Sequence, residues 1–372
     1  MLIGIPKEIK SFEHRVGMTP ASVREAIALG HDILVEKNAG HEIGFDDAEY
    51  EAAGAMIAGS SSEVFGKAEM VLKVKEPQPS EISMLQEGQI LFIYLHLAPD
   101  ESQTQALIDS GCVAIAYETV TDNRGGLPLL APMSEVAGRM AVQAGATCLE
   151  IANGGRGVLL GGVPGVAPGK VVVIGGGVVG SNSIFVATGM GGQVTVIDRD
   201  IRRLAEIDTQ YKSLITTRFS NQTNIEEEVL SADLVIGAVL VPGSEAPKVV
   251  TADMVKRMKR GAVIVDVAID QGGCIETSQP TTHAHPTYIV DDVVHYCVSN
   301  MPGAVARTST FALNNATMPF ALKIAEMGIA RALSNDPHLM KGLNIYCGKL
   351  TYEAVAMAQN RDYTPPEIAI KT

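Results

Sequence analysis

Short apolar runs alternate along the chain with longer segments in which apolar residues recur at helical spacing. In the first third, the strand-like runs are 2–5, 33–36, 70–74, 90–95 and 113–116, and the helix-like stretches between them lie near 20–29, 47–57 and 100–109. Alternating β and α units predict a parallel sheet covered by helices. Ligands of such sheets bind beyond the carboxyl ends of the strands. Polar residues that directly follow a strand are therefore the first candidates for function.

The stretch 170–198 has the most specific pattern in the chain. An apolar run is followed by Gly175, Gly177 and Gly180 at G-x-G-x-x-G spacing, then by a helix-like segment and a β-branched run that ends on Asp198. In a dinucleotide-binding unit, these glycines permit a tight turn, let the backbone approach a pyrophosphate and let the helix pack on the strand. The helix N-terminus favours phosphates, and Asp198 can accept hydrogen bonds from ribose hydroxyls. The stretch therefore predicts nucleotide binding.

The alternation continues after Asp198. The expected strands are 214–219, 233–239 and 262–270, and the expected helices are 200–209, 224–230 and 252–259. Asp270 stands at the carboxyl end of the last strand, on the same side as the glycine turn. An acid there can be a general base, a group that orients water or ammonia, or a loop cap.

Three basic groups follow strands in the first third of the chain. Arg15 comes after the first strand, Lys75 ends the run 70–75, and His96 ends the run 91–96. An arginine can hold a carboxylate with two hydrogen bonds, a lysine can polarise a carbonyl, and a histidine can exchange protons near neutral pH. The alternative interpretations are a surface arginine, a solvated lysine and a structural histidine. Lys73, in mid-strand, fits solvent exposure or an ion pair.

The connecting segments indicate two domains. Ser134 is placed to cap a helix over 135–151, a glycine-rich crossing follows at 154–165, and a second long helix is expected over 309–333. That helix would return the chain to the first domain, and a closing helix is expected over 350–359. We therefore expect a discontinuous domain of residues 1–130 and 306–372, and a nucleotide-binding domain of residues 131–305.

Composition excludes several classes of protein. The chain has 372 residues and a net charge of −13, which argues against nucleic acid because binding phosphates needs clustered Lys and Arg. The sequence contains no run of about 18 apolar residues, which is the length needed to span a bilayer. Residues 1–20 lack the apolar segment of a signal peptide. The five scattered cysteines indicate free thiols in a reducing cytoplasm. His283, His285, His295 and Cys297 match no standard metal-ligand spacing.

Several stretches together resemble the alanine dehydrogenase family, which is related to the soluble subunit of membrane transhydrogenase. The matching stretches are 3–8, 15–17, 74–77, 94–96, 133–139, 175–180, 265–271 and 300–305. The resemblance covers nearly all of the chain. It implies an α/β protein of two doubly wound, Rossmann-like parallel-sheet domains that are joined by long helices, with a cleft between them. It also implies NAD-dependent, reversible oxidative deamination of L-alanine to pyruvate and ammonium, in a cytoplasmic homohexamer.

The resemblance also implies roles for individual residues. Arg15 and Lys75 would bind the substrate, His96 would act as acid and base, and Asp270 would be the second catalytic group. NAD contacts are implied for Ser134, Gly175, Gly177, Val178, Val179, Gly180, Asp198, Arg203, Ser220, Val239, Leu240, Val267, Ala268, Ile269, Asp270, Asn300 and Met301. Several relatives have Lys at position 203, and no role is carried to Gln279. Some relatives are associated with magnesium through an acid and a histidine. Here Glu326 has no histidine nearby, so we expect no metal.

Three alternatives remain open from the sequence. A transhydrogenase subunit, which binds NAD(H) and docks on a membrane partner, would carry an Arg-Gln-Asp set where this chain has residues 130–135. A dehydrogenase of the saccharopine or lysine class would need room for a larger substrate. A catalytically silent NAD-binding regulator should not retain Arg15, Lys75, His96 and Asp270 together. A soluble protein with intrinsic turnover would exclude the transhydrogenase subunit. A substrate panel would separate alanine dehydrogenase from the saccharopine or lysine class, and any turnover at all would exclude the silent regulator.

Overall fold

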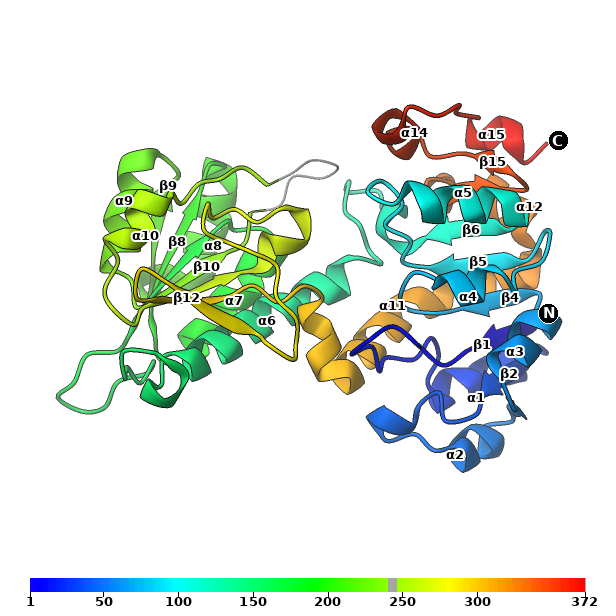
Figure 1. Ribbon diagram of the computed structural model, residues 1–372, viewed down its shortest axis with the longest axis horizontal. Helices are drawn as coiled ribbons and strands as arrows, with labels where there is room; N and C mark the ends of the chain where they lie inside the picture. Colours follow the sequence, from blue (N-terminus) through cyan, green and yellow to red (C-terminus); the bar gives the residue numbers. More distant parts are fainter. Residues whose placement is uncertain (240–245, 372) are drawn as a thin grey trace. The chain divides into compact units, whose positions relative to one another are not determined.

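The computed structural model describes residues 1–239 and 246–371. The chain divides into two compact units (Figure 1), which are Met1–Met133 with Val305–Thr372, and Ser134–Ala304. We call them unit 1 and unit 2 and describe each by itself. The sequence analysis placed the corresponding boundaries at 130/131 and 305/306. No helix among the described residues combines the length and the apolar character needed to cross a membrane.

Unit 1 is built on a sheet with the strand order β15-β14-β6-β5-β4-β1-β2-β3. The strands are β1 (Leu2–Ile5), β2 (Asp32–Glu36), β3 (Met56–Ala58), β4 (Met70–Leu72), β5 (Ile90–Ile93), β6 (Val113–Ala116), β14 (Leu343–Tyr346) and β15 (Lys349–Leu350). Strands β1 to β6 pair in parallel, whereas β14 is antiparallel to both β6 and β15. The parallel part confirms the expected α/β class.

Helices cover both faces of this sheet, with α4 and α5 on one face and α11 on the other (Figure 1). The helices are α1 (Pro20–Ala28), α2 (Asp47–Ala52), α3 (Ser61–Lys67), α4 (Pro79–Ile82), α5 (Glu101–Ser110), α11 (Ala306–Met327), α12 (Ile329–Asn335), α13 (Pro337–Met340), α14 (Glu353–Gln359) and α15 (Pro366–Ala369), with 3-10 turns η1 (His41–Ile43) and η2 (Tyr117–Thr119). Leu91 and Ile93 of β5 pack in one buried cluster with Leu107 of α5 and Val355 of α14. Burial of such apolar surface is the main term that holds the layers together.

Several expected boundaries in unit 1 are wrong. The helix predicted over 47–57 ends at Ala52, and β3 follows, because Gly54 adopts a left-handed φ of 102° and the next residues pair with β2. The helix predicted over 309–333 breaks at Gly328, where φ is 75°. The closing helix begins at Glu353 rather than at residue 350, since the preceding residues form β15.

Unit 2 contains a second sheet, in the order β12-β13-β11-β10-β7-β8-β9. Its strands are β7 (Lys170–Ile174), β8 (Gln193–Asp198), β9 (Ile215–Phe219), β10 (Leu234–Gly237), β11 (Val263–Asp266), β12 (Thr287–Val290) and β13 (Val293–Tyr296). All neighbours are parallel except β12 and β13, which form a hairpin that the sequence analysis did not foresee. Together with unit 1, this sheet confirms the expected pair of Rossmann-like folds.

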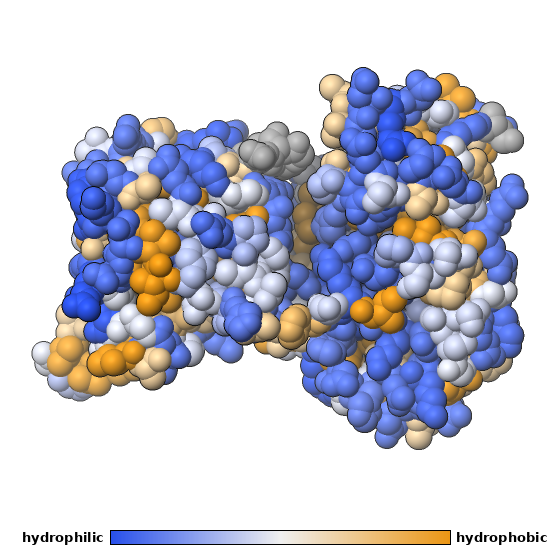
Figure 2. Space-filling view, viewed as in Figure 1, coloured by the Kyte–Doolittle hydropathy of each residue, from blue (hydrophilic) through white to orange (hydrophobic). Residues whose placement is uncertain are grey.

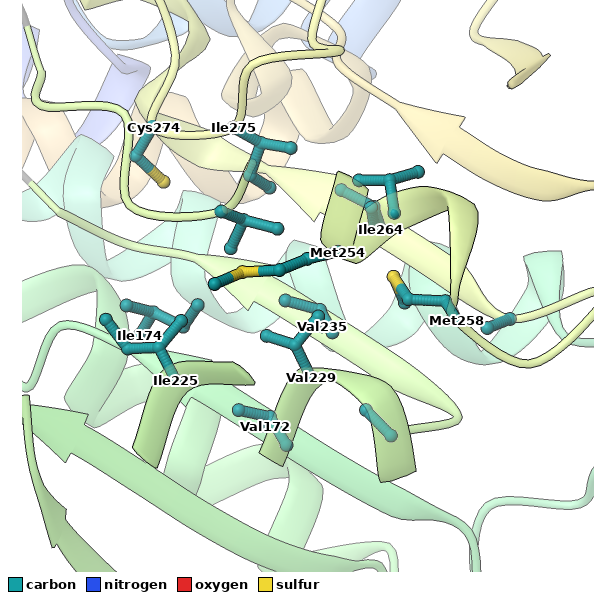
Figure 3. Close-up of a cluster of buried hydrophobic side chains, with 14 of the residues drawn as sticks. Val172, Ile174, Ile225, Val229, Val235, Met254, Met258, Ile264, Cys274 and Ile275 are labelled. Carbon is teal, nitrogen blue, oxygen red and sulfur yellow. The ribbon is translucent and has the colours of Figure 1, made fainter. Parts of the chain in front are cut away.

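The helices of unit 2 pack on an apolar core beside its central strands. They are α6 (Ala131–Cys148), α7 (Val178–Gly189), α8 (Ile201–Tyr211), α9 (Gln222–Ser231) and α10 (Ala252–Lys256), with 3-10 turns η3 (Ile151–Asn153), η4 (Lys212–Leu214), η5 (Val267–Gln271) and η6 (Met301–Val305). In the core, Val235 of β10 and Ile264 of β11 meet Val229 of α9 and Met254 of α10 (Figure 3). The same cluster includes Val172 and Ile174 of β7, the strand that leads into the glycine turn.

Candidate active site

Arg15 lies in the loop after β1 and is buried, with 2% of its surface exposed. Its guanidinium is paired with Glu13. Arg15 Nε donates to Glu13 Oε1 at 2.7 Å, and its second terminal nitrogen donates to Glu13 Oε2 at 2.5 Å. The other terminal nitrogen lies 3.0 Å from Met133 Sδ. Burial disfavours the charged form, but the hydrogen bonds and charge of Glu13 raise the pKa of Arg15. Arg15 is therefore held as a cation in a fixed orientation.

Lys75 is also held by a carboxylate after its strand. Strand β4 ends at Leu72, two residues earlier than expected. The Lys75 N–H donates to Glu8 Oε1 at 3.3 Å, and that oxygen also accepts the Val74 N–H at 2.7 Å. Lys75 Nζ lies 3.8 Å from Glu76 Oε2. Glu8 thus sets the path of the backbone that presents the Lys75 ammonium.

Lys73 is buried rather than exposed to solvent. Its Nζ lies 2.7 Å from Glu8 Oε2 and 3.0 Å from Glu81 Oε1, and all three side chains are almost fully covered. Of the two interpretations offered for Lys73, solvent exposure is wrong and the ion pair is correct. The pair supplies the counter-charge that Glu8 needs at its buried position.

His96 follows β5, which ends at Ile93. Its backbone is left-handed, with φ at 50°, and its N–H donates to Glu118 Oε1 at 2.6 Å. The imidazole stacks on Tyr94, with ring centroids 5.8 Å apart and planes 7° apart. The Tyr94 hydroxyl donates to Leu129 O at 2.5 Å. Because β1, β4 and β5 are parallel neighbours, the loops that carry Arg15, Lys75 and His96 all begin at one edge of the sheet.

The glycine turn of unit 2 lies at the carboxyl end of β7. Gly175 has φ at 104°, and a β-carbon there would meet Ala238 O at 2.5 Å. A β-carbon on Gly180 would lie 1.8 Å from Gly175 O, so only glycine lets α7 pack this close to the turn. At Gly177, the N-cap of α7, a β-carbon would meet nothing within 4 Å. The turn is therefore closed on its protein side and open at the helix N-terminus, beside the exposed Val178 and half-buried Val179.

Asp198 and Arg203 brace this turn from β8 and α8. Asp198 Oδ2 accepts the Gly176 N–H at 2.6 Å. Arg203 Nε donates to Gly176 O at 2.7 Å, and its terminal nitrogens contact Ser181 Oγ at 2.5 Å and Glu206 Oε2 at 2.6 Å. A carboxylate has about four acceptor sites, so Asp198 can still accept ribose hydroxyls. The guanidinium of Arg203 is instead directed at the turn itself.

Asp270 does not end a strand. Strand β11 ends at Asp266, and Asp270 lies exposed on the 3-10 turn η5. The buried Asp266 holds this segment because its carboxylate accepts the N–H groups of Ala268 at 3.1 Å, Cys274 at 3.0 Å and Ile275 at 3.2 Å. Burial raises the pKa of Asp266. Strand β11 ends early because hydrogen bonds to the Asp266 carboxylate replace the strand-pairing hydrogen bonds and turn the backbone.

The other expected nucleotide contacts come from several elements of unit 2. Ser134 is in the first turn of α6, not at its cap, because the helix begins at Ala131. The same helix packs on α7, where a β-carbon on Gly138 would lie 2.2 Å from Val179 O. Ser220 follows β9 and donates its N–H to Asp198 O at 2.9 Å. Val239 follows β10, and Leu240 lies outside the described residues.

Asn300 and Met301 lie where β13 leads into η6. Asn300 has φ at 62°, and its carbonyl lies 3.2 Å from His283 Nε2. Met301 is buried, and Val267, Ala268 and Ile269 form the start of η5. His295 lies between Thr277 Oγ1 at 2.8 Å and Val293 O at 3.0 Å. Within residues 1–239 and 246–371, no group of three His, Cys, Asp or Glu side chains is arranged to hold a metal ion.

Two family models match the chain. Residues 4–137 match the alanine dehydrogenase/PNT N-terminal domain, and residues 141–353 match its C-terminal domain. The chain belongs to the alanine dehydrogenase/PNT family. A curated alanine dehydrogenase of Halomonas elongata is 58% identical over 98% of both chains. A solved L-alanine dehydrogenase superposes with a TM-score of 0.94 at 51% identity, over 97% of this chain and 99% of that one. A solved transhydrogenase from Sinorhizobium meliloti reaches a TM-score of 0.81 at 26% identity, over 95% of this chain and 100% of that one.

Sequence reasoning missed the carboxylates that hold the candidate site. Glu13 is two positions from Arg15, and that spacing could have suggested a pair. Glu8 and Glu118 lie 67 and 22 positions from the residues they hold, and no local pattern connects them. In this family member, the site is therefore larger than the residues that follow the strands.

Proposed function

We propose that this chain is an alanine dehydrogenase, which catalyses NAD-dependent, reversible oxidative deamination of L-alanine to pyruvate and ammonium. The observation that carries the proposal is that Arg15, Lys75 and His96 lie in the loops that follow β1, β4 and β5, which are parallel neighbours. A carboxylate binder, a carbonyl binder and a proton carrier are the groups that a small 2-oxo acid requires. Unit 2 supplies the dinucleotide turn that such a dehydrogenase needs.

The residues of unit 2 fit a dinucleotide. The absence of a side chain at Gly177 leaves the N-terminus of α7 open to a pyrophosphate. Asp198, at the end of β8, disfavours a 2′-phosphate by charge, and Arg203 is already directed at Gly176, Ser181 and Glu206. NAD rather than NADP is therefore the proposed cofactor, and comparable catalytic efficiency with the two would contradict this choice. When bound, NAD supplies the hydride acceptor or donor.

Arg15 and Lys75 would bind the substrate. The fixed Arg15 cation would pair with the substrate carboxylate, and Lys75 would contact the carbonyl oxygen of pyruvate. An ammonium at that oxygen stabilises negative charge as it develops there. Because Glu13 and Glu8 orient these residues before substrate arrives, little rearrangement is needed on binding.

His96 and Asp270 would handle the protons and the nucleophile. His96 would take a proton as water adds to the substrate carbon and return it as ammonia leaves. Asp270, exposed on η5, would orient the water or ammonia. Both assignments follow the residues' matches to the family's motif.

A direct assay tests the proposal. NADH oxidation should require pyruvate and ammonium together, and pyruvate alone should give no turnover. A panel with serine, 2-aminobutyrate and lysine would then define the size of the substrate site. Preference for lysine with 2-oxoglutarate would move the chain to the saccharopine class.

One alternative function has a specific observation behind it, which is the fold likeness to the Sinorhizobium meliloti transhydrogenase. Under that alternative, the chain would bind NAD(H) and dock on a membrane partner without turning over alanine. Intrinsic turnover with pyruvate and ammonium separates the two functions. The lower identity of that match, 26% against 51%, favours the dehydrogenase.

We further propose that the protein assembles as a homohexamer in the cytoplasm. Unit 2 exposes a group of large apolar side chains in the segment 151–166, which are Ile151, Leu159, Val163 and Val166. Hydrophobic residues gather at the lower left of Figure 2, where this segment lies. Exposed apolar groups of this kind are typical of association surfaces. A monomer in light scattering at micromolar concentration would contradict the proposal.

A further inference from the structure

We propose that Glu118 is a positioning residue, which holds His96 in its working conformation and directs its imidazole toward the substrate. The inference rests on the proposed role of His96 in proton transfer. It is carried by one carboxylate that reaches two successive amides of the His96 loop and also lies beside the ring.

The contacts are concentrated on one side chain. Glu118 Oε1 accepts the His96 N–H at 2.6 Å and the Leu95 N–H at 3.1 Å, and its Oε2 lies 3.3 Å from the Leu95 nitrogen. The same Oε1 lies 3.9 Å from His96 Nδ1. The carboxylate side chain is 15% exposed, whereas the imidazole is 45% exposed. A largely covered acceptor therefore holds a residue whose ring remains accessible.

His96 needs this support because its backbone is unfavourable. A φ of 50° is uncommon for a residue with a β-carbon, and such residues persist only where their surroundings determine them. Strand β5 has already ended at Ile93, so sheet pairing no longer fixes the amides of residues 95 and 96. Hydrogen bonds to a charged acceptor are stronger than neutral ones, and Glu118 supplies them at the point of strain.

Glu118 is itself placed by a rigid element. It lies on η2, directly after β6, and β6 is the parallel neighbour of β5. The preceding residue, Tyr117, is buried, and its ring packs edge-on against the rings of Phe92 and Tyr94. The ring centroids are 4.5 Å and 5.1 Å apart, respectively. This aromatic cluster fixes the turn, so that the carboxylate reaches across to the end of the adjacent strand.

The imidazole has two neighbours that define its orientation. Tyr94 stacks on its face, and Glu118 lies on its Nδ1 side. Burial, and then the charge of Glu118, raise the pKa of Tyr352, so this phenol is a further titratable group near the carboxylate. Tyr94 and Glu118 thus together set the position of the His96 ring.

The test uses the full-length protein with Glu118→Ala and Glu118→Gln. Glu118→Ala removes the acceptor and should lower kcat for alanine oxidation by about tenfold to a hundredfold, in the range of a misplaced acid–base group. Glu118→Gln keeps an acceptor oxygen but loses the charge, so its kcat should be intermediate. KM for alanine and the affinity for NADH should change little, because neither depends on His96. Glu25→Ala, on the exposed side of α1, is the matched control and should leave kcat unchanged.

A double-mutant cycle separates positioning from general damage. If Glu118 acts through His96, then Glu118→Ala should cost little further activity in a His96→Ala background. Equal losses of kcat in both backgrounds would overturn the proposal.

Amide hydrogen exchange gives a readout that does not depend on activity. Exchange at Leu95 and His96 should accelerate in Glu118→Ala and less so in Glu118→Gln, without change elsewhere in unit 1. Unchanged exchange at these two amides would also overturn the proposal. If the unaltered protein fails to turn over pyruvate and ammonium, the proposed function fails, while this measurement still decides whether Glu118 holds His96.

Discussion

The two sheets share one strand order but carry different chemistry at the same place. Unit 1 runs β3-β2-β1-β4-β5-β6, and unit 2 runs β9-β8-β7-β10-β11-β13, so in each the order reverses beside the first strand. After β1 the chain places charged groups, Glu8, Glu13 and Arg15. After β7 it places the glycine turn from Gly175 to Gly180, with no charged side chain.

Under the proposed function, the difference follows from what each edge would bind. A small substrate with a carboxylate needs a fixed cation, and the buried guanidinium of Arg15 needs the counter-charge that Glu13 supplies. A pyrophosphate can be bound by backbone N–H groups at a helix N-terminus, provided that no side chain blocks them. One topology thus supports a site made of side chains in unit 1 and a site made of backbone in unit 2.

The largest effect is expected from replacing the proposed proton-transfer residue of each unit. His96→Ala and Asp270→Asn should each lower turnover by roughly a hundredfold or more, the size of a lost acid–base group. NADH affinity should stay nearly constant in His96→Ala, since that residue belongs to unit 1. It can fall in Asp270→Asn, because η5 also carries expected cofactor contacts. Steady-state kinetics and NADH titration measure both. A folded His96→Ala protein with near-normal alanine oxidation would return His96 to a structural role.

A second effect separates the charge of Arg15 from its burial. Arg15→Ala should raise the apparent KM for pyruvate through loss of a charge-assisted pair worth about 1.5–3 kcal/mol. It should also destabilise unit 1 by about 3–5 kcal/mol, because the buried Glu13 carboxylate loses the guanidinium with which it is paired. Adding Glu13→Gln should restore much of the thermal stability but not the KM. If the double variant recovers both properties, Arg15 does not bind substrate.

The backbone site of unit 2 can be probed by adding single methyl groups. Gly177→Ala should fold normally, because φ there is −67° and the added carbon meets nothing within 4 Å. It should weaken NADH binding by about tenfold, or 1.4 kcal/mol, through obstruction of the phosphates. Gly180→Ala should instead destabilise unit 2 itself, since its β-carbon would lie 1.8 Å from Gly175 O.

Gly66→Ala is the matched control for these variants. It adds a methyl group in open space on α3 of unit 1. Isothermal titration with NADH should give an unchanged affinity for it. If Gly177→Ala binds NADH as tightly as this control does, the phosphates do not lie at the turn.

The smallest expected effect is the pH dependence of the stability that the buried Lys73 contributes to unit 1. Burial disfavours its ammonium form, but Glu8 and Glu81 outweigh it and raise the pKa of Lys73 above its ordinary value of 10.5. The folded state then holds this proton more tightly than the unfolded state. The stability contributed is complete below 10.5 and is lost as pH rises through the folded-state value. The test measures Tm as a function of pH in alkaline buffers. In a triple variant with Lys73→Met, Glu8→Gln and Glu81→Gln, the fall of Tm with rising pH should be less steep than in the unaltered protein. An unchanged slope of Tm against pH would contradict the assignment.

Much of the fold was predictable because its signals are local. The apolar runs that became β1, β7 and β11 are buried on both faces, as expected for parallel strands between helices. The strands β14 and β15 were not predicted, because β14 is defined by its pairing with β6, more than 200 positions earlier. Short edge strands of this kind take their identity from a distant partner rather than from their own pattern.

The candidate site was predictable to the same degree. Arg15, Lys75 and His96 follow apolar runs, so their emergence at one sheet edge could be inferred. Their supporting carboxylates could not, because a glutamate far along the chain has no local feature that marks it as buried. Residue identity points to the candidate substrate-binding groups, whereas the groups that orient them are found only from contacts.

The discontinuity of unit 1 has a consequence during synthesis on the ribosome. The strand β6 is complete at Ala116, but its outer neighbour β14 does not begin until Leu343. At about 5–20 residues per second, the edge of β6 waits roughly 10–45 s for its partner. Helix α11, whose Thr310 and Asn314 bond the loop before α1, is equally late. Unit 2, a continuous segment, is translated in full during that interval. We therefore expect nascent unit 1 to present an open strand edge for which a chaperone can compete, and unit 2 to reach its native state first.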